Sequence, residues 1–212
     1  MLFKNKGKDM INPLDKNNSA LLKDIIAVSN RNIAESSMPG SFLTRIEDLC
    51  KTNVKAIILR EKDLNETDYL TLAKSVFNIC LKYNKKLILH SYPEVALKLG
   101  IDSIHMPLEL LRTKPSLKEQ FSTIGTSVHS ISDVIYANEI GVSYIIAGHI
   151  FETDCKKGLT PRGLDFLSDI VSIANMPVYA IGGISFDNLD EVLKTGAKGA
   201  CMMSSLMREK RS

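Results

Sequence analysis

The sequence predicts an α/β fold of the (β/α)8 barrel type in a single domain. Eight short apolar segments alternate with amphipathic helical segments at a spacing of roughly 20–30 residues, the pattern of repeated βαβ units around a parallel sheet. A chain of 212 residues suffices for one such domain. The runner-up is a doubly wound sheet, but the first apolar segment lacks the glycine-rich turn that such sheets use to bind dinucleotides.

Most of the predicted strands are near-continuous apolar runs, as expected for parallel strands that are buried on both faces; residues 103–105 and 123–127 are more polar. They cover residues 25–29, 56–59, 87–89, 103–105, 123–127, 144–147, 177–181 and 199–203.

The predicted helices show apolar residues at helical spacing between these runs. They cover residues 41–52, 65–83, 94–99, 132–140, 163–173 and 188–195. Ser41 is the expected N-cap of the first helix. The longest helix has an apolar stripe of Leu70, Ala73, Phe77 and Leu81.

The barrel domain is expected over residues 24–207, with shorter segments on either side. A polar, Asn/Lys-rich N-terminal arm spans residues 1–23, with a short helix around 19–23, and a basic tail spans residues 208–212. The eighth helix is expected to be shortened, because the sequence ends nine residues after Met203.

Composition argues against several classes of function. A net charge of +3 is too small to indicate a nucleic-acid-binding protein. No signal peptide or membrane-spanning apolar run is visible, so we expect a cytoplasmic protein with no membrane partner. The four cysteines lack CxxC or Cys/His metal spacing, and three of them lie in apolar contexts where reduced cysteines act as small hydrophobes. No metal and no cofactor is expected.

Polar residues collect where the predicted strands end, which is the active face of a barrel. The longest such segment is residues 148–163, GHIFETDCKKGLTPRG, which is longer and more polar than a simple connection requires. The four histidines, His90, His105, His129 and His149, all follow predicted strands. The alternative for any one of them is a structural polar residue.

Two further groups predict anion binding. Gly182 and Gly183 follow the seventh strand and Ser204 and Ser205 follow the eighth, where barrels commonly hold phosphate through backbone N–H groups. The alternative for the glycines is a tight turn.

Arg60 and Lys62 flank Glu61 after the second strand, and alternate residues point the same way, so both cations can address one anion. The alternative is a solvated charge cluster.

His129 is the candidate acid/base, because histidine exchanges protons near neutral pH. The alternative is a residue beside a helix cap without a chemical role. No Ser-His-Asp, HExxH or paired-carboxylate arrangement is visible. The residues alone therefore predict a phosphate-binding barrel with a histidine acid/base, and name no substrate.

Several segments resemble the thiamine phosphate synthase superfamily over about residues 25–205. They are residues 59–62 (LREK), 125–130 (GTSVHS), 179–184 (YAIGGI) and 199–204 (GACMMS). Residues 148–158, GHIFETDCKKG, resemble the TenI branch, the thiazole tautomerases; the synthase branch has a Gly-Pro start and a Thr-x-Thr-Lys pattern there.

The chain departs from the synthase branch at two magnesium-binding turns. After strand three the synthases carry Asn-Asp-Arg, where this chain has residues 90–92, His-Ser-Tyr. After strand four they carry Gly-Gln-Glu/Asp-Asp, where this chain has residues 106–109, Met-Pro-Leu-Glu. Without these acidic oxygens a site for Mg²⁺ and pyrophosphate is poorly equipped.

The resemblance implies a metal-independent thiazole tautomerase that converts a carboxylated thiazole phosphate to its aromatic tautomer. It assigns proton transfer to His129, and binding of the anionic substrate to the other candidates. These are Arg60, Lys62, Lys156, Gly182, Gly183, Ser204 and Ser205. The alternatives are a thiamine phosphate synthase, and a non-catalytic regulator that binds a phosphorylated ligand. A homo-oligomer is left open.

Overall fold

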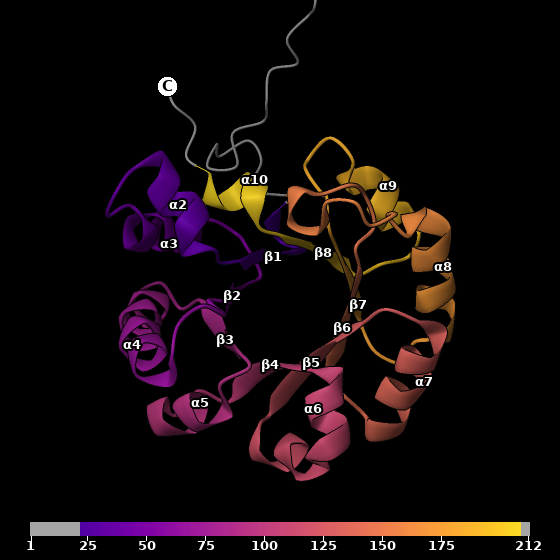
Figure 1. The fold of residues 1–212 in the computed structure, drawn as a ribbon, viewed down its shortest axis with the longest axis horizontal. Helices are drawn as coiled ribbons and strands as arrows, with labels where there is room; N and C mark the ends of the chain where they lie inside the picture. The colour runs from indigo at the N-terminus through magenta and orange to yellow at the C-terminus, as the bar shows by residue number, and fades with distance from the viewer. Residues whose placement is uncertain (1–21, 209–212) are drawn as a thin grey trace, which may run out of the picture.

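Eight parallel strands form a closed barrel in the computed structural model, which describes residues 22–208 (Figure 1). Each strand pairs with the next along the chain, and the last strand pairs with the first. The predicted (β/α)8 fold is confirmed. The strands are β1 (Ile25–Val28), β2 (Ala56–Leu59), β3 (Lys86–His90), β4 (Ser103–Pro107), β5 (Thr123–Val128), β6 (Tyr144–Gly148), β7 (Val178–Ile181) and β8 (Gly199–Met202).

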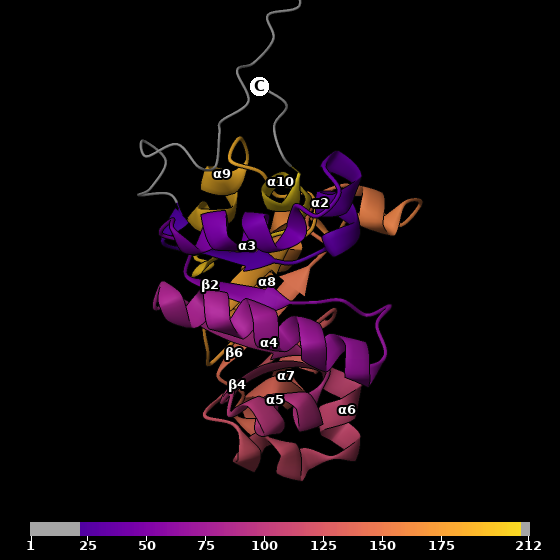
Figure 2. The same ribbon diagram turned by 90° about the vertical axis from the view of Figure 1, so that its left-hand side faces the viewer.

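Helices surround this ring on the outside, and Figure 2 shows α4 facing the viewer between α3 and α5. The α-helices are α2 (Arg31–Ser37), α3 (Phe42–Cys50), α4 (Glu66–Lys82), α5 (Pro93–Leu99), α6 (Leu108–Thr113), α7 (Ile131–Ile140), α8 (Gly163–Ile173), α9 (Leu189–Lys194) and α10 (Ser204–Met207). Among residues 22–208, two 3₁₀ helices, η2 (Pro115–Gln120) and η3 (Asp154–Lys156), lie in loops. The sequence patterns did not indicate α2 or α6.

Two sequence-based details need refinement. Ser41 is the N-cap residue of α3 as predicted, but its hydroxyl makes no capping hydrogen bond to the helix and donates instead to the Ala34 carbonyl at 3.0 Å. The stripe on α4 is displaced by one residue, because Leu81 is 61% exposed while Leu70 and Phe77 are only partly buried. The buried side chains of α4 are Tyr69, Ala73, Val76 and Cys80.

Alternation along the strands divides the core into two parts. Ile25 and Ala27 pack outward beneath the helices, whereas Ile26 and Val28 point into the barrel, where a separate apolar cluster fills the interior. The same alternation continues past the strand ends and determines which polar residues face the barrel mouth. Inward-facing members of the interior cluster are Ile26, Val28, Ala56, Ile58, Ile88, Tyr144, Ile146, Tyr179 and Cys201.

The remaining predictions concern the ends of the chain, the cysteines and the membrane. Residues 1–21 of the predicted arm and 209–212 of the predicted tail lie outside the described residues, and the last helix, α10, is short. Cys50, Cys80 and Cys201 are buried free thiols as predicted, and Cys155 is exposed. Within residues 22–208, every helix falls short of the length and apolar character needed to cross a bilayer.

Tyr69 connects α4 to the strands that carry the polar mouth. Its ring is fully buried, and its hydroxyl donates to the Leu59 carbonyl at 2.7 Å and accepts from the His90 N–H at 3.1 Å. One hydroxyl therefore holds the ends of β2 and β3, directly beside Arg60 and His90.

We predict that Tyr69→Phe lowers the free energy of unfolding by about 1–3 kcal/mol, because it leaves a buried N–H and a buried carbonyl without their shared partner. The matched control is Tyr83→Phe, whose hydroxyl bonds only to the half-buried Glu47 carboxylate, at 2.6 Å. Urea unfolding of both variants measures the difference. Equal losses would contradict this role for Tyr69.

Candidate active site

Two cavities open at the carboxyl end of the barrel, and together they contain every predicted site residue. The first, of about 400 Å³, is called here the glycine cavity. The second, of about 360 Å³, is called the histidine cavity and includes Lys62 and His129 in its lining. The predicted site residues that line the glycine cavity are Arg60, Lys156, Gly182, Gly183, Ser204 and Ser205.

The glycine pair is required by the close approach of the loop after β6. Gly182 and Gly183 have φ angles of +102° and +66°, and a Cβ on Gly182 would lie 2.3 Å from the Cβ of His149. The Ile150 and Phe151 N–H groups donate at 3.0 Å to the carbonyls of residues 181 and 182. The turn therefore has a packing role, and it also borders the cavity that anion binding requires.

Ser204 and Ser205 occupy the first turn of α10, where N–H groups have no carbonyl one turn earlier in the helix to bond. The Ser205 hydroxyl oxygen is buried and has no hydrogen-bond partner among the described residues. A buried polar atom without a partner is costly, and an anion held at this turn would supply acceptors for these groups.

Three cations surround the boundary between the cavities. Arg60 and Lys156 line the glycine cavity and Lys62 lines the histidine cavity. Burial, and then the positive charges of Arg60 and Lys156, lower the pKa of Lys62.

Glu61 does not neutralise these cations, because it turns to the other side of β2. It is buried there, accepting from the Ser29 hydroxyl at 2.5 Å and the Arg31 N–H at 3.1 Å. Glu109 and Asp133 also line the histidine cavity, and each lies beside Arg112, at 3.9 and 3.8 Å. Arg60, Lys62 and Lys156 are thus the cations available to an anion at the mouth.

His129 is held at two points. Its Nδ1 lies 2.9 Å from the Gly148 carbonyl oxygen, and its backbone N–H donates to the Asp133 carboxylate at 2.8 Å. A carbonyl only accepts, so Nδ1 carries the proton and Nε2 of the neutral ring keeps a lone pair. The sequence analysis did not identify Asp133 as a partner of His129, although Ser130 and Asp133 form a recognisable capping pattern.

The other histidines are buried. His105 contacts the Tyr144 hydroxyl through Nδ1 at 3.2 Å and the Ser127 hydroxyl through Nε2 at 2.9 Å. His149 donates from Nε2 to the Leu159 carbonyl at 3.2 Å, across the loop that follows β6. The structural alternative therefore describes His149 well.

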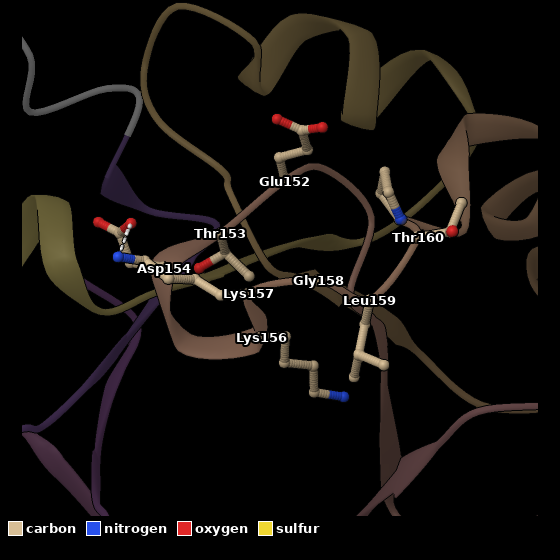
Figure 3. A pocket seen from close by; sticks show the side chains of 9 residues that line it. Glu152, Thr153, Asp154, Lys156, Lys157, Gly158, Leu159 and Thr160 are labelled. Carbon is tan, nitrogen blue, oxygen red and sulfur yellow. Dashed lines mark ion pairs between the residues drawn. The ribbon is translucent and has the colours of Figure 1, made fainter.

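The loop after β6 surrounds a third hollow of about 610 Å³, drawn in Figure 3. Its base is closed by N–H donation from Arg162 to the His149 carbonyl at 3.0 Å. Asp154 pairs with Lys157 at 3.7 Å, while Glu152 and Lys156 point to opposite sides of the loop in Figure 3. A single exposed segment forms this hollow. We therefore interpret the loop as a segment that positions Lys156, and not the hollow as a separate binding site.

Comparison with known proteins agrees with the barrel and its mouth. Residues 25–206 match the TMP-TENI family model, described as thiamine monophosphate synthase. The chain is 31% identical over 170 residues to the putative thiamine-phosphate synthase 2 of Aquifex aeolicus, covering 79% of this chain and 90% of that protein. It is 29% identical over 194 residues to the thiamine-phosphate synthase of Clostridium novyi, covering 89% of each.

A solved structure is similar over nearly the whole chain. The thiamine phosphate pyrophosphorylase from Pyrococcus furiosus superposes with a TM-score of 0.73 at 26% identity, covering 90% of this chain and 91% of that one. The fold is a (β/α)8 barrel with two cavities at the carboxyl end of its strands. The chain belongs to the thiamine monophosphate synthase (TMP-TENI) family, and is thus an enzyme of thiamine biosynthesis. The names of these relatives agree with membership of the superfamily. Assignment of this chain to the tautomerase branch stays a prediction.

We predict that the free energy of unfolding decreases as the pH is lowered, because the fold keeps buried histidines neutral. Burial, and then the charges of Lys62 and Arg60, lower the pKa of His90 to about 3. An unfolded histidine has a pKa of about 6.5, so between pH 7 and 5 the unfolded chain binds more protons and folding weakens as pH falls.

The matched variant is His90→Gln, which cannot titrate in this range. Over these two pH units it should lose about 2 kcal/mol less stability than the wild type. Urea unfolding at pH 7, 6 and 5 measures both slopes, in a range where few carboxyl groups of the unfolded chain take up protons. Parallel curves would contradict a neutral His90.

Proposed function

We propose that this protein is a thiazole tautomerase that isomerises a carboxylated thiazole phosphate to its aromatic tautomer without a metal. The observation that carries the proposal is the state of His129. Its Nδ1–H donates to the Gly148 carbonyl, so a neutral ring presents a basic Nε2 beside a cavity lined by Lys62. A base fixed in one tautomer next to cations is the arrangement that proton abstraction from carbon requires.

The reaction moves one proton and changes no other atom count. Nε2 of His129 takes a proton from one carbon of the ring system, and the electron pair left behind is delocalised toward a second carbon. The imidazolium then returns the proton to that second carbon, which leaves the ring aromatic and His129 neutral. The bond from Nδ1–H to the Gly148 carbonyl at 2.9 Å strengthens when the ring is cationic, which stabilises this intermediate state.

Substrate binding is assigned to the two cavities together. Backbone N–H groups of Gly183, Ser204 and Ser205 border the glycine cavity and would bind the phosphate group. Arg60 and Lys156 add charge at the same cavity, and Lys62 adds charge beside His129. The phosphate anchors the substrate while the ring lies at the boundary between the cavities.

Thiamine phosphate synthase is the second candidate, because the curated relatives carry that name. The magnesium ion that this reaction uses does not fit the residues present. His90 stands at the end of β3, where the ion would need an acidic oxygen, and its pKa is lowered by burial and then by Lys62 and Arg60. Within residues 22–208, no three His, Cys, Asp or Glu side chains form a group able to hold a metal. A non-catalytic regulator is the third candidate. Ligand binding alone would leave the orientation of His129 without a functional reason.

The first test incubates the protein with the carboxylated thiazole phosphate tautomer, with and without EDTA, and follows ring aromatisation by ultraviolet absorbance. We expect conversion at the same rate in both samples. Formation of thiamine phosphate from thiazole phosphate, pyrimidine pyrophosphate and Mg²⁺, without tautomerisation, would establish the synthase instead. Binding without either reaction would establish the regulator.

His129→Asn should lower kcat about 10²–10⁴-fold, the usual contribution of a general base, because an amide cannot take up the proton. Its affinity for the aromatic product, measured by calorimetry, should stay within a few-fold of the wild type. The matched control is His149→Gln, which keeps an N–H donor for the Leu159 carbonyl and should retain most activity. Wild-type turnover by His129→Asn would rule out this mechanism.

A further inference from the structure

We propose that His90 selects the carboxylated substrate by donating a hydrogen bond from Nε2 to its carboxylate, beside Lys62. This role rests on the proposed function and extends it, because it adds a specificity-determining residue and gives each anionic end of the substrate its own cavity. The phosphate belongs to the glycine cavity and the carboxylate to the histidine cavity, with the reacting carbon near His129.

His90 is placed for this contact by strand alternation. It is the last residue of β3 and shares the inward face with Ile88, so its ring lies at the top of the barrel interior. The residue is 8% exposed, and it lines the histidine cavity together with Lys62, Ser127 and His129. Its small exposed part therefore faces the cavity in which proton transfer is proposed.

The neighbouring residue, Ser91, orients the ring at the cost of backbone strain. Ser91 has a φ of +67°, a left-handed conformation that is unfavourable for a residue with a Cβ. In this conformation its hydroxyl lies 2.7 Å from Nδ1 of His90, and its N–H donates to the His105 carbonyl at 3.0 Å. A hydroxyl can donate to or accept from a ring nitrogen, and we take it here as the donor to Nδ1, the tautomer that leaves the ring proton on Nε2.

A second histidine fixes the face of the ring. His105 stacks on His90 with ring centroids 5.5 Å apart and planes at 25°. His105 is itself held by the hydroxyls of Tyr144 and Ser127. With Ser91 on one nitrogen and His105 against one face, Nε2 is the atom of His90 left for a ligand.

The charge of the surroundings determines which ligand fits. Burial, and then the charges of Lys62 and Arg60, lower the pKa of His90 to about 3, which favours the neutral imidazole. The two carboxylates that line the same cavity, Glu109 and Asp133, lie beside Arg112, at 3.9 and 3.8 Å. A neutral N–H donor can bind a carboxylate without adding a third cation to the repulsion between Lys62 and Arg60. Binding the carboxylate there also disperses the negative charge that develops when His129 removes a proton from the adjoining ring.

The experiment compares two ligands by titration calorimetry: the aromatic carboxylated thiazole phosphate and the same phosphate without the carboxylate. His90→Phe keeps an aromatic ring for stacking on His105 and removes the donor. We expect its Kd for the carboxylated ligand to rise about 10–100-fold, the usual loss for a hydrogen bond to a charged group, and its Kd for the other ligand to change by less than twofold. His90→Gln, which has an N–H donor, should recover part of the selectivity.

The matched control is Tyr144→Phe, which removes a hydroxyl from His105 without touching His90, and should weaken both ligands equally or neither. Circular dichroism checks folding, and Ser91→Ala replaces His90→Phe if that variant is unfolded, with the same selective loss expected.

Equal weakening of both ligands, or none, would overturn the role of His90. Wild-type protein that binds both ligands but does not aromatise the substrate would contradict the proposed function alone.

Discussion

The contact between the loop after β6 and the turn after β7 is the constraint on which the rest of the site depends. A Cβ on Gly148 would lie 2.3 Å from the Ile181 carbonyl oxygen, and one on Gly183 would lie 2.3 Å from the Glu152 carbonyl oxygen. The backbones that follow the adjacent strands β6 and β7 are therefore in direct contact at the barrel mouth. This contact points the Gly148 carbonyl at His129, sets the start of the loop that carries Lys156, and shapes the glycine cavity.

Environment gives the histidines different roles within one mouth. His149 donates its Nε2–H to the Leu159 carbonyl of its own loop. His105 contacts the hydroxyls of Tyr144 and Ser127. His90 is neutral because it is buried beside cations, whereas His129 is exposed, with one nitrogen committed to a carbonyl. The same side chain thus serves as a loop anchor, a core polar group, a candidate donor and a candidate base.

The strands were predictable because most are local apolar runs, and their observed ends differ from the predicted ones by at most two residues. Helices α2 and α6 were missed, whereas the equally short α5 and α9 were predicted because a glycine, Gly100 or Gly196, follows within two residues of the last helical residue. All eight candidate site residues border the two cavities, as their positions after strands implied. The division between cavities depends on barrel closure. The bond from His129 to Gly148, which joins residues 19 apart, depends on the pairing of β5 with β6.

The distribution of charge separates the two candidate reactions more sharply than the fold does. A magnesium-pyrophosphate substrate brings its own cation and needs acidic oxygens around it. Here Arg60, Lys62 and Lys156 converge, the nearby Glu61 is withdrawn into bonds with Ser29 and Arg31, and β3 ends in a histidine. The carboxylates that line the histidine cavity, Glu109 and Asp133, lie beside Arg112, so under the proposed function this distribution favours an anion that arrives without a metal. A substrate with a phosphate at one end and a carboxylate at the other, joined by a ring that must lose a proton, matches this distribution of charge.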